Sequence, residues 1–276
     1  MNIREYQQKV REQMALAQTQ SQLVSGQPLA KANNGSDYQL DTLLIAARND
    51  IARMRELPTL ADRAVFKKEK FLPQYLPFVE QYFEKGEVYQ NDLVGYCIVY
   101  LFDTGSLGQA LELANRAIAQ RQAMPDGFAS NLPTFVADQV YQWADKIAAT
   151  GQSVEPYFSQ TFQHVATAWQ LHELVTAKWL KFAARLLIRN DDGKAHAASC
   201  NDPERLEQAI LLACRAFQLH RKVGVKDLVE RSLARLKQLH KEGLIDELPQ
   251  VEGLTMKPIS IDVEKVVKLL MPSTPS

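Results

Sequence analysis

The amino-acid sequence predicts an all-α protein, and two observations support this prediction. Apolar residues recur at i, i+3 and i+4 along most of the chain, which places them on one face of each expected helix. Alternation of apolar and polar residues, the pattern of a strand, is confined to the brief stretch PISID at 258–262. Within this class we expect helical hairpins with tetratricopeptide-like packing, preceded by a helical arm and followed by a tail.

Residues 1–36 are predicted to form an N-terminal helical arm and a linker. Ile3, Val10, Ala17 and Val24 recur every seven residues, a spacing typical of a helix that pairs with another helix. The turn-forming stretch SGQPLAKANNGSD then separates this helix from the rest. The apolar stripe fits an oligomerisation arm and equally a solvated helix folded onto its own domain, so both interpretations stay open.

Residues 37–86 are predicted to form a basic helical segment, the candidate DNA-binding region. Its first helix ends at the Leu-Pro pair 57–58, because a proline disfavours the helical conformation of the preceding residue. A second helix is expected over 59–71. Pro73 and Pro77 follow, and each suits the first turn of a helix, where its missing N–H costs nothing.

Residues 87–243 are predicted to form the helical-hairpin core, which also serves oligomerisation. The stretches LGQALELANRAIAQ and LEQAILLACRAFQL share alanines and leucines at matching offsets, and such small residues let two helices approach closely. Two copies fall short of the three or more that a solenoid needs, so no repeat array is expected. The expected helices cover 91–102, 107–120, 136–147, 158–186 (as one helix or two), 206–217 and 225–239.

Residues 244–276 are predicted to be a linker and a C-terminal partner-docking segment. A stretch of acidic and turn-forming residues leads to VEKVVKLLM, a short apolar segment that can dock as a helix in the groove of a partner. The alternative is that this segment packs on the core of its own chain. The residues expected to bind the partner are Val263, Val266, Val267, Leu269 and Leu270.

Composition limits the functional classes. The chain has 276 residues, 46% of them hydrophobic and 23% charged, which is ordinary globular usage. Because 32 basic residues balance 32 acidic ones, a globally basic nucleic-acid binder is excluded, whereas a local basic face is not. The three cysteines are too few and too sparse to indicate a disulfide framework. Neither a signal peptide nor a membrane span is expected. The expected compartment is therefore a reducing cytoplasm.

Two clusters of basic residues are the candidate DNA contacts. The first has seven basic and four acidic residues and flanks the break between two helices, as in a helix-turn-helix. The second, between residues 215 and 241, has eight basic and two acidic residues. The alternative for both is a solvated helix face with i, i+4 ion pairs. The candidate DNA-binding residues are Arg48, Arg53, Arg55, Arg63, Lys67, Lys68 and Lys70 in the first cluster and Arg221, Lys222, Lys226, Arg231 and Arg235 in the second.

Signals for catalysis are weak. The phosphate-binding motifs G-x-x-x-x-G-K-[ST] and G-x-G-x-x-G do not occur, so we expect no ATPase activity, no cofactor and no catalytic residue. Two-metal nuclease chemistry requires converging carboxylates, and the nearest candidates are the loop residues Asp191, Asp192, Asp202 and Glu204. A loosely zinc-like spacing, for which we expect no metal, is formed by His196, Cys200, Cys214 and His220.

Several motifs, taken together and in order, resemble the small terminase subunit family of temperate, cohesive-end tailed bacteriophages. They are Lys67-Lys68, Leu72-Pro73, Tyr75-Leu76-Pro77, Val79, Gly86, Leu101-Phe102-Asp103-Thr104-Gly105, Ala110-Leu111-Glu112, Met124-Pro125, Ala216, Gln218-Leu219, Gly224-Val225-Lys226 and Glu230-Arg231. The resemblance covers about two-thirds of the chain, roughly residues 40–239. An Asp-Thr-Gly triplet also occurs in aspartic proteases, but their strand-rich fold does not match this sequence.

This resemblance implies a protein that recognises double-stranded viral DNA at the packaging site, assembles into a homo-oligomeric ring, and delivers the DNA to the large ATPase-nuclease subunit in the host cytoplasm. The chain departs from the family at its end, where an apolar helix and PSTPS replace the family's strongly basic tail. Two alternatives remain: a metal-dependent endonuclease subunit that cuts the cohesive-end site, as family naming sometimes has it, and a helical protein-interaction scaffold.

Overall fold

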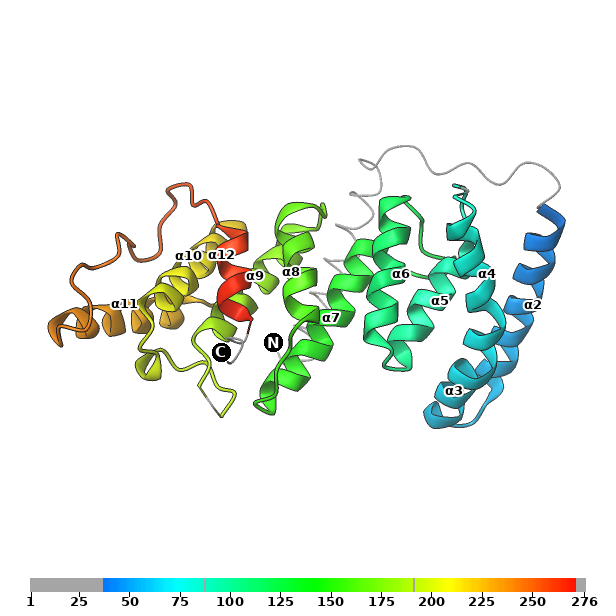
Figure 1. The fold of residues 1–276 in the computed structure, drawn as a ribbon, viewed down its shortest axis with the longest axis horizontal. Coiled ribbons are helices and arrows are strands. Elements are labelled where there is room, and N and C mark those ends of the chain that lie inside the picture. Colours follow the sequence, from blue (N-terminus) through cyan, green and yellow to red (C-terminus); the bar gives the residue numbers. More distant parts are fainter. Residues whose placement is uncertain (1–36, 87, 191, 272–276) are drawn as a thin grey trace. The chain divides into compact units, whose positions relative to one another are not determined.

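The structure is a computed structural model that describes residues 37–86, 88–190 and 192–271, and this part of the chain is α-helical (Figure 1). It contains no β-strand, only an isolated bridge between Arg189 and Ala195. The prediction of an all-α fold is therefore confirmed. The expected N-terminal arm lies outside the described residues.

The helices follow one another along the chain, with connections that range from none to the long segment 242–262 before the last helix. They are α2 (Asp37–Glu56), α3 (Leu60–Phe66), the π-helical turn η1 (Lys67–Phe71), α4 (Leu72–Glu84), α5 (Asp92–Asp103), α6 (Leu107–Ala119), α7 (Leu132–Ala149), α8 (Tyr157–Thr167), α9 (Glu173–Leu187), the 3₁₀ turn η2 (Ala197–Ser199), α10 (Pro203–Leu219), α11 (Lys226–Lys241) and α12 (Val263–Leu270). None of the described helices has the length and hydropathy needed to cross a membrane.

The described residues divide into two compact units, one that ends at Val136 (unit 1) and one that begins at Ala137 (unit 2). The boundary falls inside α7, within the range 87–243 that the sequence suggests as one core. The apolar positions of α7 continue through the boundary, since Val136, Val140 and Ala144 are all fully buried. Nothing in the apolar pattern of the sequence therefore marks where one unit gives way to the next.

In unit 1, α2 and α3 meet at the predicted break. Thr59 caps α3, because its Oγ1 accepts a hydrogen bond of 3.0 Å from the backbone N–H of Asp62. Behind this turn, the helices α4 and α5 pack around Phe71, whose ring centroid lies 4.5 Å from that of Tyr75 and 4.6 Å from that of Tyr100. This aromatic contact anchors the α3–α4 segment on α5.

Helix α3, the π-helical turn and α4 follow one another directly, which differs from the expectation that each proline would open a helix. Pro73 lies in the first turn of α4, but Pro77 lies inside that helix. A wider π-helical turn, in which the N–H of Leu72 bonds the carbonyl of Lys67, directly precedes Pro73, where a proline ring would otherwise crowd an α-helical carbonyl. The ring of Pro77 is exposed, so its helix continues with the loss of one hydrogen bond.

Unit 2 is built around an aromatic core. The rings of Phe158 and Trp179 stack with centroids 5.0 Å apart, and Phe158 also contacts Phe162 and Phe182. The apolar pattern over 158–186 is thus carried by two helices, α8 and α9, the second of the two possibilities left open by the sequence. Helix α9 packs on α10, and α10 packs on α11 in turn.

The C-terminal helix α12 packs against α8 and α9 of its own chain. Val266 is fully buried, whereas Val263, Val267, Leu269 and Leu270 are half-buried. An ion pair of 2.9 Å between Lys265 and Glu204 joins α12 to the start of α10. Val266 is thus used within its own chain, as the alternative left open by the sequence has it. Docking of a partner on the other four apolar side chains, which stay partly accessible, remains a prediction.

Candidate nucleic-acid interface

The first basic cluster lies at the end of unit 1 formed by α2, α3 and η1. The turn of residues 57–59 joins two helices, as the helix-turn-helix interpretation requires. Exposed cations lie before and after this turn: Arg53 and Arg55 in the last turns of α2, and Lys68 and Lys70 in η1, beyond the far end of α3. The segment from the end of α2 to η1 therefore carries cations that solvent, and a phosphate backbone, can reach.

These exposed cations make few contacts within the described part of the chain. Arg53 is 75% exposed and lies 3.6 Å from Asp50, a surface pair of the kind worth about 0–1 kcal/mol. Arg55 and Lys68 form no ion pair with a described residue, and the Nζ of Lys70 lies 5.7 Å from the ring centroid of Phe66. Because so little holds them in place, all four can move to meet a ligand.

Arg48 occupies an intermediate position in the same cluster. Its guanidinium lies 3.7 Å from the carboxylate of Asp92 at the start of α5, and its side chain is 59% exposed. A loose, exposed pair of this kind leaves the guanidinium able to contact a phosphate as well.

Two members of the first cluster instead hold the fold together. Arg63 donates hydrogen bonds to the carbonyls of Leu57 and Arg55, at 3.1 and 3.0 Å, and so closes the end of α2. Lys67 is only 16% exposed, pairs with Asp103 at 2.7 Å and lies 4.9 Å from the ring centroid of Tyr100. The donors of both side chains are used within the chain.

The contact between Lys67 and Asp103 brings together two of the motifs that carry the family resemblance. Asp103 opens the Asp-Thr-Gly triplet, Thr104 bonds the carbonyl of Tyr100 at 2.8 Å, and Gly105 ends the helix with a φ of +78°. The triplet thus ends α5 and positions a carboxylate for Lys67. Its role in this fold is structural.

The second cluster is less uniform than the sequence suggests. Arg221, Lys222 and Lys226 are exposed in the turn before α11 and at its first residue. Lys226 pairs loosely with Glu230, at 3.7 Å one turn later. Arg231 lines a pocket between α9 and α11.

Arg235, in contrast, is 11% exposed and its donors are used within the chain. It bonds the carbonyl of Cys200 at 3.2 Å and the side chain of Asn201, and lies 3.7 Å from Glu242. This arginine fixes the segment before α10 to α11, and sequence position alone did not separate it from its exposed neighbours.

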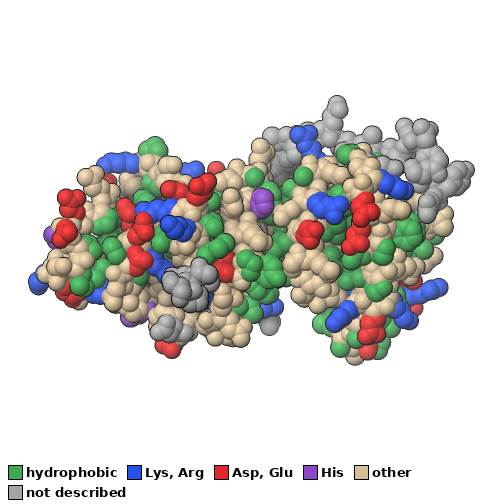
Figure 2. All heavy atoms as spheres, viewed as in Figure 1, with side chains coloured by type: hydrophobic (Ala, Val, Ile, Leu, Met, Phe, Trp, Pro, Cys, Tyr) green, Lys and Arg blue, Asp and Glu red, His purple; other side chains and the backbone are tan. Residues whose placement is uncertain are grey.

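The described surface mixes positive and negative charge on the one face that Figure 2 draws. On the face drawn in Figure 2, Lys and Arg side chains are interspersed with Asp and Glu, as the zero net charge implies. Any nucleic-acid contact must therefore be local, at a place such as the α2–α3 turn, where several exposed cations come close together in the sequence.

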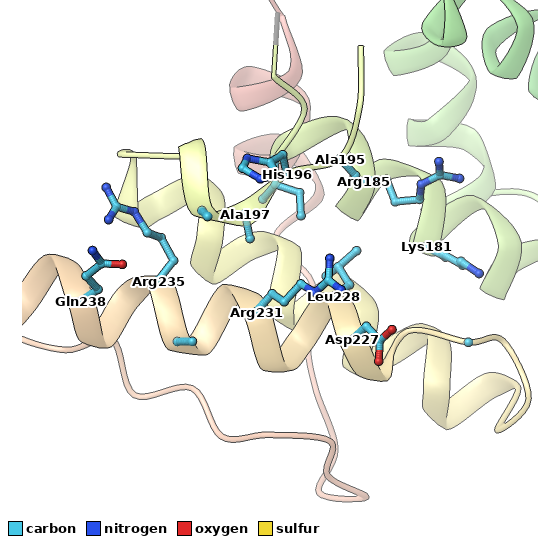
Figure 3. A pocket seen from close by; sticks show the side chains of 14 residues that line it. Lys181, Arg185, Ala195, His196, Ala197, Asp227, Leu228, Arg231, Arg235 and Gln238 are labelled. Atoms are coloured by element: carbon cyan, nitrogen blue, oxygen red, sulfur yellow. The ribbon is translucent and has the colours of Figure 1, made fainter. Parts of the chain in front are cut away.

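Two cations near the second cluster were missed by sequence reasoning. Lys181 and Arg185 lie one turn apart on α9 and line the same pocket as Arg231 and Arg235 (Figure 3). The sequence interpretation assigned α9 to the aromatic core, and both residues lie more than twenty positions before the basic stretch. The sequence did offer one signal for these two residues: they are spaced i, i+4, on the side of the helix opposite its apolar face.

The candidate nuclease carboxylates do not converge in the described part of the chain. Asp192 is exposed and Asp191 lies outside the described residues. Asp202 caps α10 by accepting a hydrogen bond of 2.9 Å from the N–H of Glu204, whose carboxylate pairs with Lys265. Within the described residues no three His, Cys, Asp or Glu side chains lie close enough together to hold a metal ion.

The cysteines of the loosely zinc-like series are also placed apart from one another. Cys214 is buried in α10, with its Sγ 3.7 Å from the carbonyl of Gly253, and burial raises the pKa of its thiol. Cys200 is half-buried near the start of α10, and burial raises the pKa of this thiol as well. Burial thus favours the neutral thiol form of both cysteines.

Comparison with known proteins places this fold in a viral context. A family model described as "Phage small terminase subunit" matches residues 44–174. The chain is 48% identical over 272 residues, 98% of its own length and 95% of the relative's, to a protein of Haemophilus phage HP1 (strain HP1c1) named "Probable terminase, endonuclease subunit".

It is also 31% identical over 172 residues, 62% of its length and 64% of the relative's, to the "Terminase, endonuclease subunit" of Escherichia phage P2. No solved structure matches the chain. The residues matched by the family model include all of α3 to α8. The alignment with the protein of phage HP1 covers nearly the whole chain. The chain therefore belongs to the phage small terminase subunit family.

Proposed function

We propose that this protein binds the duplex DNA of the viral packaging site through exposed cations around the α2–α3 turn and delivers that DNA to the large ATPase-nuclease subunit. The observation that supports this proposal best is the contrast within the first cluster. Arg53, Arg55, Lys68 and Lys70 are exposed and loosely held, although they sit on helices, at the end of α2 and in η1 after α3. Phosphate contacts require this combination of free cations and a fixed scaffold.

The exposed residues Arg221, Lys222 and Lys226 would supply a second, sequence-independent contact to phosphates. We leave Arg63, Lys67 and Arg235 out of the proposed contact set, because their donors are used within the chain. This contrast between exposed and internally bonded basic residues predicts that charge alone does not decide which of them contribute to DNA binding.

The partners follow from the same proposal. The large terminase subunit supplies ATP hydrolysis, since this sequence carries no phosphate-binding motif of its own. Packaging takes place in the host cytoplasm, and the small subunit acts there as a homo-oligomer that forms a ring around or beside the DNA. Symmetric assembly would place the same cationic turn on every subunit.

Affinity for a packaging-site duplex tests the proposal. Replacing Arg53, Arg55, Lys68 and Lys70 with alanine is expected to weaken binding at least tenfold, because four loosely held cations are removed. The matched control replaces four other exposed lysines, Lys85, Lys146, Lys194 and Lys268, and changes the net charge equally. An equal loss in both variants would leave only a general effect of net charge and contradict a site at the α2–α3 turn.

One observation favours a second candidate, an endonuclease subunit, because both relatives carry that activity in their names. The full chain would then cut packaging-site DNA in the presence of Mg²⁺ or Mn²⁺ without the large subunit. Alanine at Asp191 and Asp192 would abolish cleavage if these acids hold the metal. A purified chain that binds the duplex but leaves it intact with either metal rejects this candidate.

A further inference from the structure

A pocket of about 570 Å³ lies in unit 2 between α9, the segment at 195–198 and α11 (Figure 3). Along α11 it extends from Gly224 to Gln238, so it is an elongated groove of roughly 20 Å at the helical rise of about 1.5 Å per residue. Four of the side chains that line it are those of lysine or arginine, and a single one, Asp227, is acidic. The groove is therefore suited to an anionic occupant.

Two of these cations have no partner in the described part of the chain. Lys181 donates a hydrogen bond of 2.7 Å to the carbonyl of Val223, and Arg235 is held by the segment before α10. Arg185 and Arg231 form no ion pair or hydrogen bond with a described residue, and both are exposed. They come from different walls of the groove, α9 and α11, so one occupant can meet both.

Much of the surface between these arginines is apolar. Ala195, Ala198 and Ala234 are exposed in the groove, and Ile188 and Leu228 lie behind them. A DNA duplex, about 20 Å wide and polar on its outer surface, would leave such a surface uncovered. A peptide that offers carboxylates next to aliphatic side chains would satisfy both parts of the groove.

The chain itself carries such a peptide at the end of α11. The stretch Leu-Ile-Asp-Glu-Leu at 244–248 has two apolar side chains that are unusually exposed, Leu244 at 63% and Leu248 at 42%. Asp246 and Glu247 between them are exposed and form no ion pair with a described residue. Two adjacent acids are thus flanked by exposed leucines on this segment.

This segment lies at the end of the groove of its own subunit, away from Arg185 and Arg231. The N–H of Leu244 bonds the carbonyl of Leu239 at 2.9 Å, and the carbonyl of Ile245 lies 3.2 Å from the ring of His240, so the segment is fixed to the end of α11. Arg231 lies ten residues before the last residue of that helix, about 15 Å away along the helix axis. A segment 244–248 that meets these arginines therefore comes from a second copy.

We propose that the acidic segment 244–248 of one subunit docks in the Arg185–Arg231 groove of the next. The contact joins two different surfaces, so it is a head-to-tail interface, which closes into a ring when the rotation between neighbours divides a full turn. The carboxylates of Asp246 and Glu247 pair with the two guanidinium groups, and Leu244 and Leu248 cover the alanines. This inference rests on the homo-oligomer of the proposed function but not on its DNA binding.

Charge reversal in the full-length protein tests the docking. The variants are Arg185→Glu with Arg231→Glu, Asp246→Arg with Glu247→Arg, and all four substitutions together. Sedimentation velocity over a concentration series should give at least a tenfold rise in the subunit dissociation constant for each reversed pair, and recovery to within a few-fold of the unsubstituted protein when the pairs are combined. Thermal unfolding of each variant checks that unit 2 still folds.

Matched controls reverse exposed charges that do not line the groove. Lys237→Glu with Lys241→Glu alters the same helix, and Glu264→Arg alters an exposed acid on α12. Assembly of these variants should match that of the unsubstituted protein. A labelled peptide of residues 242–250 should also bind the full chain and lose that binding when Arg185 and Arg231 are reversed.

Several outcomes would overturn the inference: an unsubstituted chain that stays monomeric, an assembly that survives both reversals, or an assembly weakened by the arginine reversal alone. The last would mean that the groove takes a different occupant. DNA affinity measured on the same samples separates this inference from the proposed function. Loss of DNA binding in the Arg53, Arg55, Lys68 and Lys70 variant does not depend on how the groove variants assemble.

Discussion

At the scale of single residues, the neighbours of a basic side chain decide what it does. Lys67 and Lys68 are adjacent in the sequence and identical in charge, yet Lys67 is held between Asp103 and the ring of Tyr100, whereas Lys68 is exposed. The sequence placed both in one candidate cluster, because a helical pattern does not reveal which carboxylates from other helices will meet it. Only tertiary contacts separate the two lysines.

This difference predicts opposite effects for two neighbouring substitutions. Lys67→Ala should lower the free energy of unfolding by roughly 1 kcal/mol, because it removes a short ion pair with Asp103 together with the contact of a largely buried side chain on the ring of Tyr100. Lys68→Ala should leave stability within about 0.5 kcal/mol and weaken duplex DNA binding instead. Urea unfolding and DNA titration of both variants check the prediction; a larger stability loss for Lys68→Ala would contradict it.

A second prediction concerns Glu155, which lies before α8. Burial raises the pKa of its carboxyl above the usual 4.5, although a hydrogen bond from Ser159 opposes this shift, and its Oε1 is buried without a partner in the described chain. The native state therefore holds this proton more tightly than the unfolded state does. The resulting stability is present below pH 4.5 and is lost as the pH rises through the raised pKa.

Glu155→Gln should therefore stabilise the protein at pH 7 relative to the unsubstituted chain, and this advantage should shrink as the pH falls toward 4.5. The exposed Glu112, replaced by glutamine, is the control and should give no such pH dependence. Urea unfolding at several pH values measures both. An advantage of Glu155→Gln that does not change with pH would show that the charge of this carboxyl does not matter.

At the scale of elements, periodicity and capping residues predicted most helices, and longer-range packing decided the rest. The break at 57–59 was predictable because Pro58 ends α2 and the threonine after it caps α3. Pro77 inside α4 was not, because a π-helical turn just before the helix changes the hydrogen-bond register. The sequence left open what α12 packs against, since an apolar stripe does not show whether it packs on its own chain or on a partner.

The packing of α12 makes a further prediction about this element. Val266→Ala should lower the free energy of unfolding by roughly 1–3 kcal/mol, because the side chain is fully buried against its own domain. Glu264→Ala, on the exposed face of the same helix, should have little effect. Equal, near-zero effects of both substitutions in thermal or urea unfolding would mean that α12 is detached in solution and free to meet a partner.

At the scale of the whole molecule, the balanced net charge hides local differences that only the fold reveals. The groove of unit 2 takes its cations from α9 and α11, more than forty residues apart in the sequence, so no single stretch of sequence predicts it. The division into two units inside α7 was equally hidden, because the apolar pattern of that helix is continuous. The all-α fold was therefore predictable from the sequence, whereas the groove and the boundary between the two units were not.

The salt dependence of DNA binding by the intact protein tests whether the exposed cations of α2 and η1 contact phosphates. We expect the logarithm of the association constant for a packaging-site duplex to fall steeply and linearly with the logarithm of salt concentration. Each phosphate contact contributes about 0.9 to the slope, so replacing Arg53, Arg55, Lys68 and Lys70 with alanine should make the slope shallower by about 3–4. An unchanged slope in that variant, or no binding by the unsubstituted protein at low salt, would contradict DNA binding through these cations.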